Sequence, residues 1–165
     1  MPDRRADFDR FVNDNTDRLL RTAYLIVWDL PEAEDLVQET LFKVAKRWPR
    51  VRRMERPAAY ARRILVNLAL DGSGRRSRRQ SELSGEAPPE RADDGNAFEI
   101  RDELLTALAE LPPRQRAVLV LRYFLDLPEA EVADALKCSV GTVKSSASRG
   151  LVRLQQTLTT RSVPT

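Results

Sequence analysis

The chain has 165 residues, of which 42% are hydrophobic and 32% are charged, a balance typical of a globular protein. It contains no histidine, which removes the commonest general base. Its single cysteine, Cys138, excludes an internal disulfide and a thiolate metal cluster. No apolar run approaches the ~20 residues that span a bilayer, and the N-terminus lacks the apolar core of a signal peptide, so a cytoplasmic location is expected.

Charge is distributed unevenly along the chain. The net charge is −5 over residues 1–39, +11 over residues 40–79 and −3 over residues 80–165. A dense basic block between acidic segments indicates a surface for a polyanion next to a surface for a different, protein partner. A merely solvated basic helix is the alternative interpretation of the same block.

Helical periodicity predicts a first all-α module over residues 6–71. Asp29 and Glu32 have the spacing of a capping box at the start of one helix. Pro49 is expected to end that helix, and Gly72 to stop the last helix of the module. The side chains expected to face inward are Phe8, Phe11, Val12, Leu19, Leu20, Ala23, Tyr24, Val27, Leu36, Val37, Leu41, Val44, Ala45, Trp48, Tyr60, Ile64, Leu65, Leu68 and Ala69.

Residues 72–98 are predicted to be a flexible linker. They hold four of the six glycines of the chain and the Pro88-Pro89 pair. Their apolar residues are too few and too scattered to build a core. A flexible segment of this length has a typical span of roughly 30 Å and a far greater extended reach.

A second all-α module is predicted over residues 99–160. Leucines at helical spacing mark its first helix, which Pro112-Pro113 should end. Asp126 stands before Leu127-Pro128-Glu129, and we expect it to cap the next helix as Asp29 caps its own. The leucines of the first helix are Leu104, Leu105, Leu108 and Leu111.

The end of this module has the pattern of a helix-turn-helix. A short helix is expected over residues 129–136, a turn at 137–139 and a second helix from Val140. Lys137 departs from the glycine that suits such a turn. The residues expected to face inward on the second helix are Val143, Ala147, Leu151 and Leu154. Those expected to project outward, with groups suited to phosphates and base edges, are Thr142, Lys144, Ser145, Ser148 and Arg149. An ordinary helical hairpin with a polar face remains the alternative.

Four segments together resemble one protein family. Leu111–Phe124 (LPPRQRAVLVLRYF) and Cys138–Ser145 (CSVGTVKS) resemble the promoter −35-binding domain of extracytoplasmic-function (ECF) sigma factors of bacterial RNA polymerase. Ala33–Leu41 (AEDLVQETL) resembles the polymerase-binding helix of that family, and Arg62–Asp71 (RRILVNLALD) its −10-recognition helix. The resemblance implies two small helical domains, sigma region 2 and sigma region 4, and is nearest to the actinobacterial SigE-like branch.

An acidic, amide-bearing ridge is expected on the helix that follows Asp29. Asp35, Gln38 and Glu39 lie at positions i, i+3 and i+4, so they share one helix face. The resemblance names core RNA polymerase as the partner of this ridge. The residue pattern alone is equally consistent with an ordinary solvated helix face.

The stretch 46–63 interleaves eight basic residues with Trp48 and Tyr60. Cations that follow a backbone and aromatic rings that stack on bases are the usual parts of a single-strand binding site. Trp48 is better explained as a core residue, whereas Tyr60 fits either role. With the resemblance added, the residues expected to capture the melted −10 strand are Arg52, Arg53, Arg56, Tyr60, Arg63 and Asn67.

The resemblance implies a non-enzymatic factor that acts without cofactor or metal. Its implied partners are core polymerase and promoter DNA, duplex at −35 and melted at −10, and an anti-sigma factor is left open. The competing interpretation is a one-component helix-turn-helix regulator of duplex DNA, which leaves the basic first module unexplained. A nuclease would need a metal-binding carboxylate cluster or a nucleophile–base pair, and the sequence suggests neither.

Overall fold

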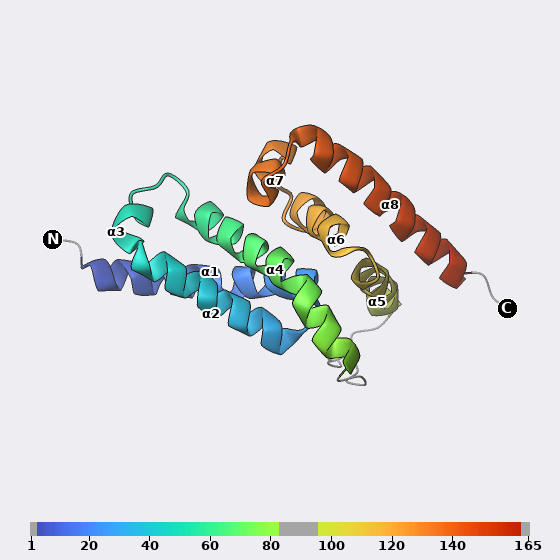
Figure 1. Ribbon diagram of the computed structural model, residues 1–165, viewed down its shortest axis with the longest axis horizontal. Helices are drawn as coiled ribbons and strands as arrows, with labels where there is room; N and C mark the ends of the chain where they lie inside the picture. Colours follow the sequence, from blue (N-terminus) through green and yellow to red (C-terminus); the bar gives the residue numbers. More distant parts are fainter. Residues whose placement is uncertain (1–2, 83–95, 163–165) are drawn as a thin grey trace.

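The computed structural model describes residues 3–82 and 96–162 (Figure 1). Within those ranges the fold is all-α, as expected, and contains no strand. The helices of the first module are α1 (Arg4–Val27), α2 (Leu30–Lys46), α3 (Trp48–Val51) and α4 (Pro57–Glu82). The elements of the second module are α5 (Asn96–Ala109), α6 (Pro113–Leu119), the π-helical turn η1 (Val120–Phe124), α7 (Glu129–Leu136) and α8 (Val140–Ser162). None of these helices has both the length and the apolarity to cross a membrane.

Local capping chemistry explains where the first helices begin and end. The Asp29 carboxylate accepts a hydrogen bond from the backbone N–H of Glu32 at 2.9 Å, which confirms the predicted cap of α2. The preceding helix, α1, ends at Val27, and the next residue, Trp28, adopts the left-handed conformation (φ 58°) and donates its N–H to the Tyr24 carbonyl. The helix α2 ends at Lys46, and Pro49 then lies in the first turn of the short α3.

The prediction that Gly72 stops a helix is wrong. The helix α4 runs through Gly72 to Glu82. One glycine inside a helix costs only about 1 kcal/mol relative to alanine, and the arginines that follow are good helix formers. Of the rest of the predicted linker, residues 83–95 lie outside the described residues, and residues 96–98 form the start of α5.

The helix-turn-helix forms at the predicted positions, with α7 and α8 separated by residues 137–139. Lys137 occupies the turn in the left-handed conformation (φ 54°), where a glycine would be unstrained. The predicted cap at Asp126 is wrong. Asp126 has φ 52° within the preceding turn, and α7 begins after Pro128 with no side-chain cap.

Two residues predicted to face inward are exposed, Ala45 and Leu151. On α8 the buried side follows Val143, Ser146 and Gly150. Because residues seven apart are almost in line on an α-helix, Gly150 falls below Val143 and Leu151 turns away. Gly150 lies so close to α6 that a Cβ there would come within 3.1 Å of Leu119 Cδ1.

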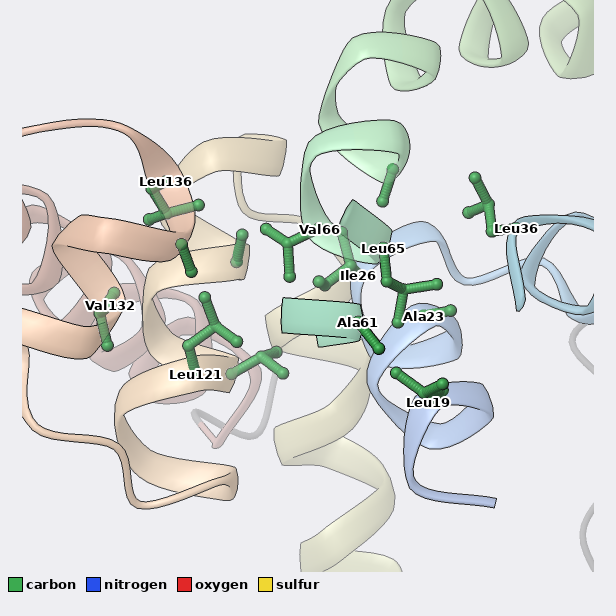
Figure 2. Packing of buried hydrophobic residues seen from close by; sticks show 14 of the residues in the cluster. Leu19, Ala23, Ile26, Leu36, Ala61, Leu65, Val66, Leu121, Val132 and Leu136 are labelled. Carbon is green, nitrogen blue, oxygen red and sulfur yellow. The ribbon is translucent and has the colours of Figure 1, made fainter. Parts of the chain in front are cut away.

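The two modules share one hydrophobic core. The helix α4 of the first module packs against α6 and α7 of the second, and α1 packs against α6 and η1 (Figure 1). Figure 2 shows Val66 of α4 facing Leu121, with Val132 and Leu136 of α7 beyond it, while Leu65 points towards α1. Each fully buried side chain of this size contributes about 1.5–3 kcal/mol, so this shared core holds the modules together.

Arg116 ties the ends of two helices together at this junction. Its guanidinium donates to the carbonyls of Leu108 at 3.2 Å, Ala109 at 2.7 Å and Leu111 at 2.9 Å, at the end of α5. It also donates to the carbonyl of Ile26 in the last turn of α1. Helix C-termini carry unpaired carbonyls and partial negative charge, so one cation satisfies both ends. Burial lowers the pKa of Arg116 below the ordinary arginine value.

Candidate nucleic-acid and polymerase interfaces

The predicted ridge on α2 is a continuous exposed face. Asp35, Gln38 and Glu39 are all exposed, and Leu36 and Val37 are buried on the opposite side of the helix. The buried side anchors α2 on the bundle and leaves the acidic ridge free for a partner.

Sequence reasoning missed a residue of this face, Phe42. It lies four positions after Gln38 and three after Glu39, so it continues the ridge. Its side chain is 60% exposed, and Lys46 Nζ lies 4.5 Å from the ring centroid. The sequence did contain a signal for Phe42, because this apolar residue falls outside the inward-facing stripe of α2. Exposed aromatic rings beside charges are typical of protein interfaces.

Trp48 is a core residue, as the sequence suggested. Its ring lies 5.3 Å from Phe8 and 5.2 Å from Phe11, centroid to centroid, and its Nε1 donates to the Arg4 carbonyl at 3.1 Å. Arg52 follows α3 and forms a 2.6 Å ion pair with Asp7 of α1. These contacts hold the turn between α3 and α4 against the start of α1.

The other residues expected to capture the −10 strand fall mainly on one face of α4. Tyr60, Arg63 and Asn67 are spaced by three and four positions and therefore share that face, and Arg56 stands just before it. Tyr60 and Asn67 are half-buried, with Tyr60 packed against the core, and Arg63 is exposed. Arg53 is exposed in the turn between α3 and α4. Of these arginines, Arg56 and Arg63 thus lie on or beside the α4 face with Tyr60 and Asn67, whereas Arg53 does not.

The arginines of this face contact α7. Arg56 forms an ion pair with Glu131, and Arg63 Nη1 lies 3.3 Å from Asp134 Oδ2. A further arginine, Arg62, reaches Glu131 Oε2 at 3.5 Å. The pKa of Arg62 is lowered from the ordinary arginine value, mainly by burial. The negative charge of Glu131 opposes this shift, and the positive charge of Arg56 adds to it. The prediction did not include Arg62, Glu131 or Asp134, because contacts between distant segments leave no local pattern.

The residues predicted to project outward from the second helix of the helix-turn-helix lie on α8 and are exposed or half-buried. Thr142, Lys144, Ser148 and Arg149 are exposed, and Ser145 is half-buried with its hydroxyl donating to the Thr142 carbonyl. The Ser139 hydroxyl accepts from the Thr142 backbone N–H at 3.1 Å and so fixes the start of the helix. Lys144 Nζ lies 3.7 Å from Glu129 Oε2 of α7.

The fold and these faces define a helical protein with two modules, one basic bundle and one helix-turn-helix. The family description "Sigma-70 region 2" matches residues 11–80, and "Sigma-70, region 4" matches residues 101–154. The chain therefore belongs to the sigma-70 family of RNA polymerase sigma factors, in its ECF group.

Two similar curated proteins come from actinobacteria. The chain is 35% identical to the RNA polymerase sigma-E factor of Streptomyces coelicolor over 94% of this chain and 88% of that protein. It is 34% identical to the ECF RNA polymerase sigma factor SigG of Mycobacterium tuberculosis over 93% of this chain and 49% of that protein. Among solved structures, the sigma factor RpoE in complex with the anti-sigma factor NepR from Bartonella quintana has a TM-score of 0.76 at 24% identity, covering 93% of this chain and 97% of that one, which supports the fold.

Proposed function

We infer that the protein binds core RNA polymerase and directs it to specific promoters, as a sigma factor that reads −35 and −10 elements and holds melted DNA. The observation that carries this function is the match of both modules to sigma regions 2 and 4 along one chain. The match to region 2 distinguishes it from a one-component regulator, for which the helix-turn-helix alone would suffice. We assign it no catalytic activity of its own and a cytoplasmic location, where its polymerase and promoters lie.

The division of labour follows from the exposed faces. The ridge of α2, extended by Phe42, docks on core polymerase. The outer face of α8 enters the major groove of the −35 element, because hydroxyls and cations there suit phosphates and base edges. Arginines and Tyr60 around the start of α4 hold the unpaired −10 strand.

Run-off transcription with purified core polymerase and genomic promoters tests this function. We expect promoter-specific transcripts that require both the protein and core enzyme. Co-sedimentation should show a complex of one chain with one core enzyme. A protein that dimerises on duplex DNA and leaves core polymerase unbound would contradict the proposal.

A further inference from the structure

Two arginines of the α6–η1 segment hold the first helix of the helix-turn-helix, α7, near its two ends. Arg114, at the start of α6, donates from Nη2 to the carbonyl of Leu136, the last residue of α7, at 3.2 Å. Arg122 of η1 donates from Nη1 to the carbonyl of Leu127, two residues before α7 begins, also at 3.2 Å. Both contacts lie within the second module, and together they span the length of α7.

The end of α7 needs a side-chain donor. The two backbone N–H groups that follow α7 bond back to carbonyls of its own last turn, those of Ala133 and Asp134. The carbonyl of Leu136 accepts from Arg114 instead, and a cation suits this place because helix C-termini carry partial negative charge. Arg114 thus secures a turn in which Lys137 holds the left-handed conformation (φ 54°).

The approach to α7 is tied to η1 twice. The backbone N–H of Leu127 donates to the carbonyl of Leu121 at 3.1 Å, and the carbonyl of Leu127 accepts from Arg122. The guanidinium of Arg122 also lies over the ring of Tyr123, with Cζ 5.7 Å from the centroid, which helps to keep it in place. Leu127 is therefore held through both of its backbone polar groups.

The apolar side of α7 does not fix its direction by itself. Val132 and Leu136 are buried on the side of Leu121 (Figure 2). Apolar burial is non-directional, so a helix of eight residues can tilt on such a surface at little cost. Hydrogen bonds are directional and weaken steeply when they are misaligned. Contacts at both ends therefore fix the tilt that burial leaves free.

The direction of α7 sets the direction of α8, because only residues 137–139 separate the two helices. Arg149 lies about 13 Å along α8 from Val140, so a tilt of about 10° at the turn displaces it by about 2 Å. A hydrogen bond to a base edge tolerates a change in length of only a few tenths of an ångström, about one tenth of that displacement. Readout by α8 therefore requires a fixed α7.

We propose that Arg114 and Arg122 are positioning residues for −35 recognition, which hold α7 at both ends and so fix the direction in which α8 presents its outer face. This inference rests on the proposed function, because it takes that face as the −35 site. The two arginines act through α7 and contact no DNA themselves. Their loss leaves α8 helical but lets it point in more than one direction.

The spread of distances between α7 and α8 in the free full-length chain tests the hold on α7. Spin labels are placed on Ala130→Cys of α7 and Gln155→Cys of α8, two exposed positions. The substitution Cys138→Ser keeps the labels off the native thiol. Double electron–electron resonance then reports the distribution of distances between the two labels.

Arg114→Ala/Arg122→Ala should broaden this distribution by about 4 Å, the displacement that a tilt of about 10° produces about 22 Å along α8. Its control, Arg18→Ala/Arg21→Ala, removes the same charge from two exposed positions of α1 and should keep the wild-type width. The single variant Arg114→Ala, at an exposed residue, should broaden the distribution in part and serves if the double variant unfolds. Circular dichroism checks that each variant is folded at the temperature of labelling.

Promoter binding by the complex with core polymerase tests the consequence for −35 recognition. If a correctly placed α8 is populated in only about one tenth of the molecules, affinity for the −35 element falls about tenfold. The double arginine variant should therefore lose about tenfold in affinity for a promoter that the wild type transcribes, and stay within about twofold of the control when the −35 element of that promoter is scrambled. Two lost phosphate contacts would instead weaken both promoters alike and lower the slope of log affinity against log salt concentration by about 2.

Two results would overturn the proposal. One is a distance distribution of the double arginine variant that is no broader than that of the α1 control. The other is an equal loss of affinity on both promoters with a shallower salt dependence, which would make the arginines phosphate ligands. If the wild-type protein supports promoter-specific transcription in either case, only the positioning role is lost and the sigma function stands. A distribution that broadens, in a protein that fails to start transcription, would support the hold on α7 and overturn the sigma function.

Discussion

Single side chains add polar contacts where the modules of this protein meet. Arg116 is the clearest case, because one guanidinium serves carbonyls at the ends of α1 and α5. Arg62 is a second case, since its Nε is buried without a hydrogen-bond partner while its Nη2 reaches Glu131. A buried cation that loses water must find its hydrogen bonds in the protein. Both arginines therefore belong to the junction as much as to their own helices.

Replacing Arg116 with methionine should lower stability sharply. The substitution keeps an apolar stem but leaves buried carbonyls of two helix ends without their donor, at a cost of about 2–4 kcal/mol. In a chain of this size the midpoint of thermal unfolding should fall by about 5–15 °C in circular dichroism. Arg153→Met, at an exposed position of α8, is the matched control and should change stability by less than about 0.5 kcal/mol. Equal melting of the two variants would contradict the role given to Arg116.

At the scale of elements, helix faces separate binding from packing. The helix α2 buries one side and presents Asp35, Gln38, Glu39 and Phe42 on the other. Periodicity predicted the polar residues of this division, because a helix repeats every 3.6 residues whatever it packs against, but it missed Phe42 and placed the exposed Ala45 inward. It failed for Leu151, where close packing of Gly150 on Leu119 sets the rotation of α8. Fine rotation of a helix depends on its neighbours, which periodicity does not contain.

The exposed ring of Phe42 makes the α2 ridge testable. Phe42→Ala should weaken binding to core polymerase by about 1–3 kcal/mol, a typical loss for an aromatic anchor at the centre of an interface. Thermal stability should hardly change, because the ring is mostly exposed. Phe124→Ala, another exposed ring in the π-helical turn η1, serves as the control and should bind core polymerase normally. Affinity can be measured by fluorescence anisotropy of the labelled protein against core enzyme.

The outer face of α8 gives a second prediction at this scale. Lys144→Ala or Arg149→Ala should weaken −35-dependent promoter binding by about 1–3 kcal/mol if the side chain contacts base edges. If the side chain contacts only phosphates, its loss should weaken binding by a similar amount on every DNA sequence. Binding to core polymerase should stay intact. Unchanged −35-dependent transcription from both variants would show that the recognition helix is misassigned.

The whole molecule is a compact arrangement in which the two modules share a core. Figure 1 shows α4 between the helices of its own bundle and those of the second module. A protein bound to two elements one and a half turns of duplex apart would have to span about 50 Å, at ~34 Å per turn. Direct contact of α4 with α7 is incompatible with that separation. Opening of the molecule is thus part of the proposed function.

Promoter melting tests the molecule as a whole. The double substitution Tyr60→Ala/Asn67→Ala should reduce open-complex formation strongly, because each trapped base loses stacking and polar contacts worth about 1–3 kcal/mol. A promoter with an artificially unpaired −10 region should partly rescue the variant, because the unpairing cost is already met. Permanganate footprinting measures the open fraction on both templates. Because Tyr60 packs against the core, the thermal unfolding curve of the double variant must be recorded as well. Equal defects on both templates would place these residues in packing or polymerase contact instead.

The sequence by itself determined the features that depend on near neighbours in the chain. The cap at Asp29, the exposed ridge of α2 and the bounds of the helix-turn-helix follow from spacings of three to eight residues. The tertiary structure alone decided how the modules face each other. Arg56 and Glu131 are 75 residues apart, and Arg116 and Ile26 are 90 apart. Such contacts form because the apolar sides of α4, α6 and α7 exclude water together, and a linear pattern does not specify which helices share that burial.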